Sequence, residues 1–256
     1  LGAAGDAAEP EVRLFAQLLD CDLIAVGDKA LKSPAAILEE IRKTPALYAR
    51  LKPPFLSWIH GDLHFKNILL DARLPQMIKI MLVDPKGTRV KEFSVGTGDP
   101  AYDLGKLLYS SGGRYYLIQD QLFCPPGGSL RISKDKKEAT VEAFAKVDKG
   151  RAPVLGGLSK DRLSVYRATV PYWIWDVFDN LGRHLKECVE QTTDYHTEDP
   201  DWLLRACLYE GLHFCCLAPM CAEENPEEAC NLFLRGTELL NKFWKTYNDG
   251  GFPVPA

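Results

Sequence analysis

The chain has 256 residues, of which 46% are hydrophobic and 26% are charged, and its formal net charge is −4. These values are ordinary for a folded globular domain and exclude a disordered, collagen-like or low-complexity chain. The length allows one large domain or two small ones with a sizeable core. The mild acidity argues against nucleic acid as a partner, because phosphate backbones are bound by basic surfaces.

The apolar runs, the N-terminus and the cysteines indicate in which cellular compartment the protein lies. Apolar runs are short, and none approaches the roughly 18 residues of a membrane span, so we expect no membrane partner. Residues 1–6 have neither a basic start nor an apolar run and do not resemble a signal peptide. Because the first residue is Leu1, we expect a fragment or a processed product. The eight cysteines form no Cys-x-x-Cys pair, and we interpret them as reduced, buried thiols of a cytoplasmic protein.

The first half of the chain changes in texture after the pair Pro53-Pro54. Before it, apolar residues at helical spacing predict a helical lead-in over residues 1–52, in which Ser33-Pro34 begins one helix. After it, short apolar runs predict a β-hairpin with strands at 68–70 and 78–83. Asp99-Pro100 then begins a short helix that should end near residue 110.

The second half is predicted to be an insertion followed by long helices. Residues 112–160 are rich in Gly, Pro and Lys and are interpreted as an irregular insertion, with an exposed strand or hairpin at 129–133. Long helices are predicted over 171–191, over 201–217 with an end before Pro219, and from the capping sequence Asn225-Pro226-Glu227-Glu228 to about Trp244.

One loop carries residues suited to phosphoryl transfer. Asp62 and Asn67 have the spacing of a catalytic loop in which a carboxylate accepts a hydroxyl proton and an amide oxygen binds a metal near the same phosphate. Asp84 follows the next strand, at the position of a second metal-binding carboxylate. His60 is interpreted as a structural histidine that holds the loop. His64 is a candidate for contact with the transferred phosphate.

Three motifs in order carry a resemblance to a known family: His60-Gly61-Asp62 with Asn67, then Asp84-Pro85-Lys86-Gly87, then Gly98-Asp99-Pro100-Ala101-Tyr102-Asp103-Leu104. Together they resemble the aminoglycoside phosphotransferase family, and most of all its streptomycin-kinase-type members. That family has a protein-kinase-like fold and phosphorylates small molecules. The resemblance implies that Asp62 is the catalytic base, that Asn67 and Asp84 bind Mg²⁺, and that Asp103 is a buried carboxylate bracing the catalytic loop. It further implies ATP or GTP as donor and a small-molecule hydroxyl of an aminoglycoside, sugar or amino alcohol as acceptor.

The resemblance covers the C-terminal lobe of the family's fold. We therefore expect residues 1–256 to form a single, mainly helical α+β unit, with a lead-in (1–52), a catalytic core (53–111), the irregular insertion (112–160) and a helical substrate-side subdomain (161–256). The family's nucleotide-binding N-lobe, with its Gly-rich turn and phosphate-gripping lysine, has no counterpart before His60. We expect that lobe to be absent, which should cost the isolated chain orders of magnitude in rate.

The acceptor pocket is the least determined part of the site. In the resembled family, substrate groups come from the C-terminal helices and are often acidic, because the substrates are cationic. Trp175, Asp176, Asp179 and Glu210 are the candidates here. The simpler interpretation of the aromatic stretch around Trp175 is packing of a helix core.

Three other functions are compatible with parts of the sequence. A non-catalytic kinase-like module that binds a ligand or partner is the main alternative to an enzyme. A dinucleotide-binding domain is a remote one, since Gly96-x-Gly98-x-x-Ala101 matches a pyrophosphate-binding pattern. Asp99 opposes it, because its negative charge lies where pyrophosphate would approach the helix. A metallophosphoesterase would need further clustered ligands downstream, which the sequence lacks.

Overall fold

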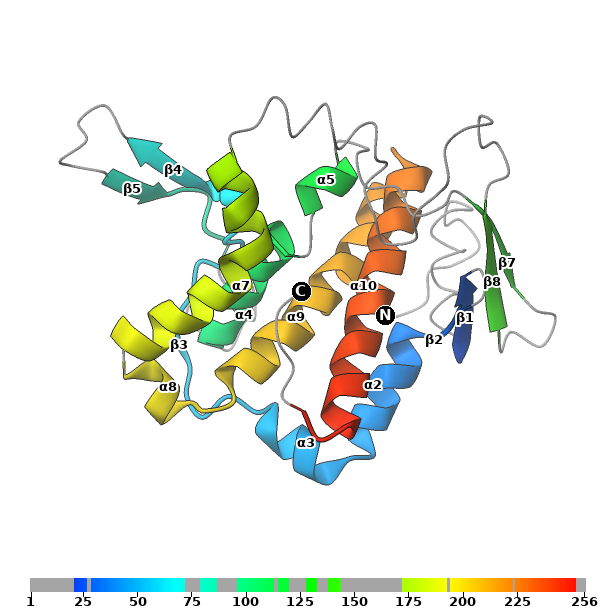
Figure 1. Cartoon of the computed structure of the whole chain (residues 1–256), viewed down its shortest axis with the longest axis horizontal. Helices are drawn as coiled ribbons and strands as arrows, with labels where there is room; N and C mark the ends of the chain where they lie inside the picture. The colour runs from blue at the N-terminus through cyan, green and yellow to red at the C-terminus, as the bar shows by residue number, and fades with distance from the viewer. Residues whose placement is uncertain are drawn as a thin grey trace.

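The computed structural model describes residues 21–26, 29–71, 79–86, 96–112, 115–119, 128–132, 138–143, 172–192, 194–222 and 224–251. The described part is a mainly helical α+β structure, as predicted. Its elements are β1 (Leu23–Val26), β2 (Lys29–Lys32), α2 (Pro34–Arg42), α3 (Pro45–Arg50), β3 (Ser57–Trp58), η1 (Phe65–Asn67), β4 (Ile68–Asp71), β5 (Lys79–Leu82), β6 (Thr97–Gly98), α4 (Pro100–Ser110), α5 (Tyr115–Gln119), β7 (Gly128–Ile132), β8 (Glu138–Ala143), α7 (Tyr172–Thr192), α8 (Tyr195–Glu198), α9 (Trp202–Cys221) and α10 (Pro226–Asn248). Helices α9 and α10 lie side by side at the centre, with α2 beside α10 and α4 against α9 (Figure 1).

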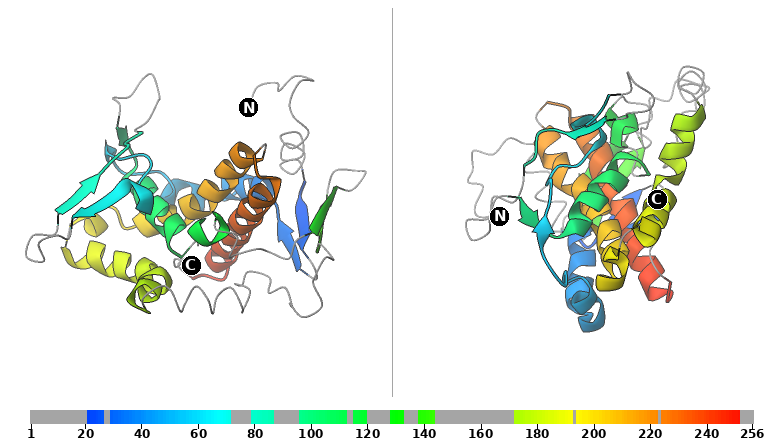
Figure 2. Two further views of the ribbon diagram at one scale, coloured as in Figure 1. Left: turned by 90° about the horizontal axis from the view of Figure 1, so that it is seen from above. Right: turned by 90° about the vertical axis from the view of Figure 1, so that its left-hand side faces the viewer.

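The strands form one four-stranded sheet and two separate two-stranded sheets. The larger sheet has the order β2-β1-β8-β7, in which β1 is antiparallel to β2 and parallel to β8. The pairs β3–β6 and β4–β5 are both antiparallel. The four-stranded sheet and the β4–β5 hairpin lie at opposite ends of the molecule (Figure 2). Strand β7 confirms the strand expected at 129–133, so the insertion contains regular structure as well as α5.

The expected helical lead-in over residues 1–52 is wrong for residues 23–26 and 29–32, which form β1 and β2. Branched and apolar side chains such as Ile24 suit a strand, and Ile24 is fully buried. The sheet is completed by β8, far along the chain, and local periodicity does not reveal such a pairing. Helix α2 begins where predicted, because Ser33 Oγ accepts the Ala36 N–H at 3.1 Å. The part of the prediction on residues 1–20 lies outside the described residues.

The long C-terminal helices largely confirm their sequence signals. The Asn225 side chain accepts the Glu228 N–H at 3.1 Å and donates to the Glu228 carboxylate at 3.2 Å, which forms the predicted cap of α10. The expected end of α9 before Pro219 is wrong, since the helix continues to Cys221. Ala218 and Ala222 flank that proline and are fully buried, so packing of the last turn outweighs the lost N–H.

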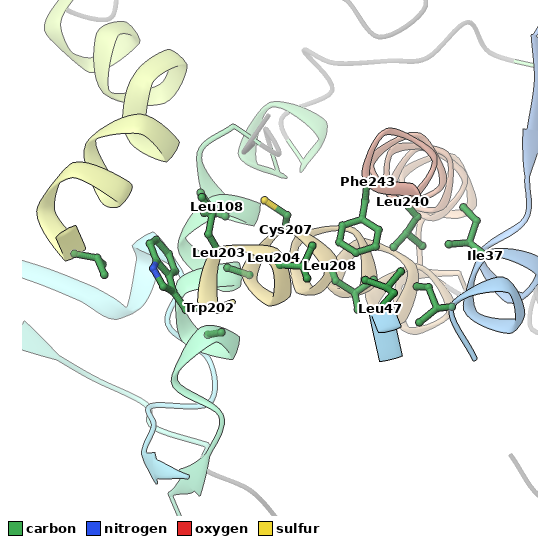
Figure 3. Packing of buried hydrophobic residues seen from close by; sticks show 14 residues of the cluster. Ile37, Leu47, Leu108, Trp202, Leu203, Leu204, Cys207, Leu208, Leu240 and Phe243 are labelled. Atoms are coloured by element: carbon green, nitrogen blue, oxygen red, sulfur yellow. The ribbon is translucent and has the colours of Figure 1, made fainter. Parts of the chain in front are cut away.

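Helix α9 is the centre of the hydrophobic core. Its first two turns are buried on all sides, and the apolar side chains of α2, α4 and α10 pack around them (Figure 3). Helix α4 comes very close to α9 at Gly105, where an added Cβ would lie 2.6 Å from the Cβ of Tyr209. This contact fixes α4 against α9 and thereby positions the side chains of α4 that face the candidate site.

None of the described helices is long and apolar enough to be a membrane span.

The predicted β-hairpin is confirmed in β4 and β5, and it projects from the helical body (Figure 1). Ile68 pairs with Leu82, and the Val83 N–H donates to the Asn67 carbonyl at 3.0 Å, which extends the ladder into the neighbouring loops. Apolar side chains on both strands are exposed: Leu70 and Ile80 are each 65% exposed. The hairpin therefore connects to the candidate site at one end and presents apolar surface along its length.

Candidate active site

The loop at residues 60–67 is compact, and it places Asp62 next to Asn67. The Asn67 amide donates to the Asp62 backbone carbonyl at 2.9 Å, and the His64 N–H donates to the same carbonyl at 2.8 Å. The Asn67 N–H then donates to the His64 carbonyl at 2.9 Å as η1 begins. Asp62 and Asn67 are both buried. The five-residue spacing read from the sequence is thus closed by hydrogen bonds within one turn.

Asp103 of α4 holds the start of this loop. Its carboxylate accepts the His60 N–H at 2.6 Å and the Gly61 N–H at 2.9 Å. Gly61 has a φ of 79°, which is a left-handed conformation that glycine adopts without a Cβ clash. Two adjacent N–H groups can therefore turn toward a single carboxylate. This is the bracing contact that the family resemblance implies for Asp103.

The His60 ring joins the loop to the end of the hairpin. Its Nε2 lies 2.8 Å from the Val83 carbonyl, which can only accept, so Nε2 carries the proton. The other ring nitrogen, Nδ1, accepts the Asp62 N–H at 3.3 Å. The Lys86 N–H in turn donates to the His60 carbonyl at 2.9 Å. These contacts hold the segment that contains Asp84 beside the loop. Asp84 is exposed and has a φ of 55°, the only positive φ among non-glycine residues of the described ranges.

Two lysines and a histidine surround the Asp62 carboxylate. Lys86 Nζ bonds Asp62 Oδ2, Lys106 Nζ lies 3.3 Å from Oδ1, and His64 Nε2 lies 3.7 Å from Oδ2. The sequence motifs give neither lysine a role. Lys106 comes three residues after Asp103 on α4, so one face of this helix contacts the loop twice. That spacing was the available signal for Lys106.

These neighbours set the charge state of Asp62. Burial raises the pKa of its carboxyl, but the hydrogen bond from Lys86 and the positive charge of Lys106 outweigh burial and leave the pKa below its ordinary value. Burial lowers the pKa of His64, and the lysine charges lower it further against the attraction of Asp62. At neutral pH, Asp62 is therefore ionised and His64 is neutral. The His64 Nδ1 lies 3.2 Å from the Tyr116 hydroxyl, which orients the ring.

The motif that suggested a dinucleotide site has a different role in the structure. The Asp99 carboxylate caps α4 by accepting the Ala101 N–H at 3.0 Å. It also accepts from the Arg205 guanidinium at 2.7 and 3.1 Å, and from the Tyr209 hydroxyl at 3.1 Å. Arg205 binds a second buried carboxylate, Asp199. The N-terminus of α4 is thus already occupied by an anionic side chain of this chain, which argues against a pyrophosphate there.

Of the four residues expected to line the acceptor pocket, only Glu210 has a described side chain. Trp175, Asp176 and Asp179 belong to α7, and their side chains lie outside the described residues. Glu210 is only 2% exposed on α9, in the interior of the helical body. This burial makes Glu210 a core residue, and it does not line a surface that a substrate can reach.

Within the described ranges, no three His, Cys, Asp or Glu side chains gather closely enough to hold a metal ion. The pair predicted for Mg²⁺, Asn67 and Asp84, consists of one amide and one carboxylate, both of them the hard oxygen donors that Mg²⁺ prefers. The expectation of buried thiols is wrong for Cys188 and Cys216, which are exposed.

Comparison with protein-family models, with curated proteins and with solved structures found no match for this chain.

Proposed function

We propose that the chain is the C-terminal lobe of a kinase-like phosphotransferase, which moves the γ-phosphate of ATP or GTP to a hydroxyl of a small molecule. The observation that carries the proposal is the convergence of three motif residues. Asp62 and Asn67 share one hydrogen-bonded loop, and the His60 ring and the Asn67 carbonyl both bind Val83, the neighbour of Asp84. The resemblance to the aminoglycoside phosphotransferase family supports the same assignment.

Asp62 is suited to orient the acceptor hydroxyl. Its carboxylate is ionised at neutral pH and can accept a hydrogen bond from an incoming hydroxyl. In the transfer step, the acceptor oxygen forms a bond to the γ-phosphorus, the bond from that phosphorus to the β–γ bridging oxygen breaks, and the hydroxyl proton passes to Asp62. A carboxyl with a lowered pKa is a weak base, so its contribution is mainly positioning. Positioning suffices for a loose phosphoryl-transfer transition state.

Asn67 and Asp84 are the residues that would hold Mg²⁺. The Asn67 amide nitrogen is engaged with the Asp62 carbonyl, which fixes the direction of the amide oxygen. Asp84 has a positive φ, a backbone conformation that favours glycine. Such local strain is found at functional sites. When bound, the ion would supply neutralisation of phosphate charge.

The proposal is tested by titrating the chain with ATP or GTP, with and without Mg²⁺, and then measuring nucleoside diphosphate release with aminoglycoside, sugar and amino-alcohol acceptors. We expect Asp84→Asn to abolish the Mg²⁺ dependence of binding. Asp62→Asn should lower turnover by about 10²–10⁴-fold while nucleotide still binds. Asp22→Asn, at an exposed carboxylate, is the matched control. Turnover in Asp62→Asn equal to that of the wild type would refute the role of Asp62.

A non-catalytic kinase-like binding module is the second candidate. It is favoured by the ion pairs of Lys86 and Lys106 with Asp62, since both carboxylate oxygens already have cationic partners. Nucleotide binding with no diphosphate release, whichever acceptor class is offered, would identify the module.

A further inference from the structure

Two ammonium groups reach the Asp62 carboxylate from different elements. Lys106 comes from the middle of α4, and Lys86 comes from the segment that follows β5. Each contacts a different oxygen of Asp62. Two cationic side chains therefore gather on one carboxylate, beside the group that would face the acceptor.

The two lysines differ in how firmly they are held. The Lys106 side chain is only 14% exposed, and its ammonium lies 4.8 Å from the centre of the Tyr109 ring, so its position is fixed by packing and by a cation–π contact. The Lys86 side chain is 58% exposed and can follow a ligand. Lys106 is therefore a fixed cation and Lys86 an adaptable one, and both lie beside the carboxylate of Asp62. Two cations placed in this way can bind a phosphoryl group and neutralise its charge.

We propose that Lys106 and Lys86 form a phosphate subsite beside Asp62, which takes the terminal part of the donor's triphosphate. The inference rests on the proposed function for the identity of the anion. In the chain without ligand the lysines bind Asp62. With the triphosphate present they bind phosphate oxygens, and the Asp62 carboxylate becomes available to the acceptor hydroxyl. The subsite supplies positive charge from the same lobe as the proposed base.

Two other carboxylates of the described residues, Asp84 and Asp103, lie in or against the same segments and have roles of their own. Asp84 is an exposed carboxylate of the same segment as Lys86, and the proposed function gives it to Mg²⁺. The Asp103 carboxylate is engaged by two backbone N–H groups at the start of the loop. Among these carboxylates, Asp62 therefore is the one with which a phosphate must compete.

The test is calorimetric titration of the whole chain with inorganic tripolyphosphate, in the absence of acceptor. We expect Lys106→Met and Lys86→Met each to weaken binding by about tenfold or more, as loss of a charge-assisted hydrogen bond does. Lys66→Met is the matched control. It removes the same charge from the 60–67 loop, but the Lys66 ammonium lies over the Tyr116 ring, 5.4 Å from its centre. The control should bind within about twofold of the wild type.

Two more variants keep the test decisive. Lys106→Arg retains the charge, so it should bind tripolyphosphate even if Lys106→Met fails to fold. Asp62→Asn removes the competing carboxylate and should bind tripolyphosphate more tightly than the wild type. Absence of wild-type binding, equal weakening in Lys66→Met and Lys106→Met, or preference for a sugar monophosphate over tripolyphosphate would each overturn the subsite.

The outcomes separate the subsite from the proposed function. Lysine-dependent tripolyphosphate binding without turnover on any acceptor would support the subsite and refute the phosphotransferase. Phosphate transfer with unaltered kcat and KM in Lys106→Met and Lys86→Met would support the phosphotransferase and refute the subsite.

Discussion

Replacing Asp103 by alanine would remove the one carboxylate that holds the start of the 60–67 loop. Two backbone donors would lose their acceptor, the His60 N–H at 2.6 Å and the Gly61 N–H at 2.9 Å. Leaving a buried donor unsatisfied costs about 1–3 kcal/mol. The Gly61 N–H is only partly buried, so its loss should cost less than that of the His60 N–H. The wild-type protein also pays a cost for burying the Asp103 carboxylate, and burial accordingly raises its pKa. We therefore expect Asp103→Ala to lower the free energy of unfolding by about 2–4 kcal/mol.

The assay is urea unfolding followed by tryptophan fluorescence at neutral pH. The midpoint should move to lower urea with little change in slope, since the surface exposed on unfolding is nearly the same. Asp22→Ala is the control, because its side chain is exposed, and it should change stability by less than about 0.5 kcal/mol. A loss below about 1 kcal/mol in Asp103→Ala would show that the two N–H groups find water, and the bracing argument would then fail.

Two further predictions concern buried charge. Burial is the main cause that lowers the pKa of His213 to about 3, from an ordinary value of 6.5. In the unfolded chain the His213 imidazole takes up a proton below pH 6.5, whereas in the folded chain it does so only near pH 3. Lowering the pH to 4 should therefore reduce the free energy of unfolding by roughly 3 kcal/mol. His213→Gln keeps a donor for the Tyr102 carbonyl, 3.4 Å from His213 Nε2, and should remove that part of the pH slope in urea unfolding; an unchanged slope would contradict the assignment. Arg205→Met would leave Asp99 and Asp199 buried without their cation, and should cost about 3–5 kcal/mol in thermal or urea unfolding at pH 7. Stability equal to the wild type would show that the ion network contributes nothing.

Local signals predicted much of this fold. The capping residues Ser33, Asp99 and Asn225 begin helices where the sequence places them, since a cap needs only the next three residues. The β4–β5 hairpin follows from two apolar runs with a short connection. The parallel pairing of β1 with β8 could not be predicted in this way, because it depends on segments far apart in the sequence.

The same difference between local and long-range signals applies to the candidate site. The Asp62–Asn67 spacing is a property of one loop and was readable directly. The convergence of Lys86 and Lys106 on Asp62 depends on how α4 packs against α9, through the close contact at Gly105. The role of Arg205 was hidden for the same reason, since its carboxylate partners lie in different segments.

The exposed β4–β5 hairpin has a consequence for the affinity of the site. Its ladder continues into the bond between the Val83 N–H and the Asn67 carbonyl, so the register of the hairpin also sets the register of Asn67 against Asp84. A two-stranded hairpin with apolar faces in water is only marginally stable alone. Only molecules in which Asn67 and Asp84 are in register can bind an ion between them. The apparent affinity for that ion is therefore proportional to the fraction of such molecules. A contact that covers Leu70 or Ile80 would raise that fraction and tighten binding at a distance, without touching the ion.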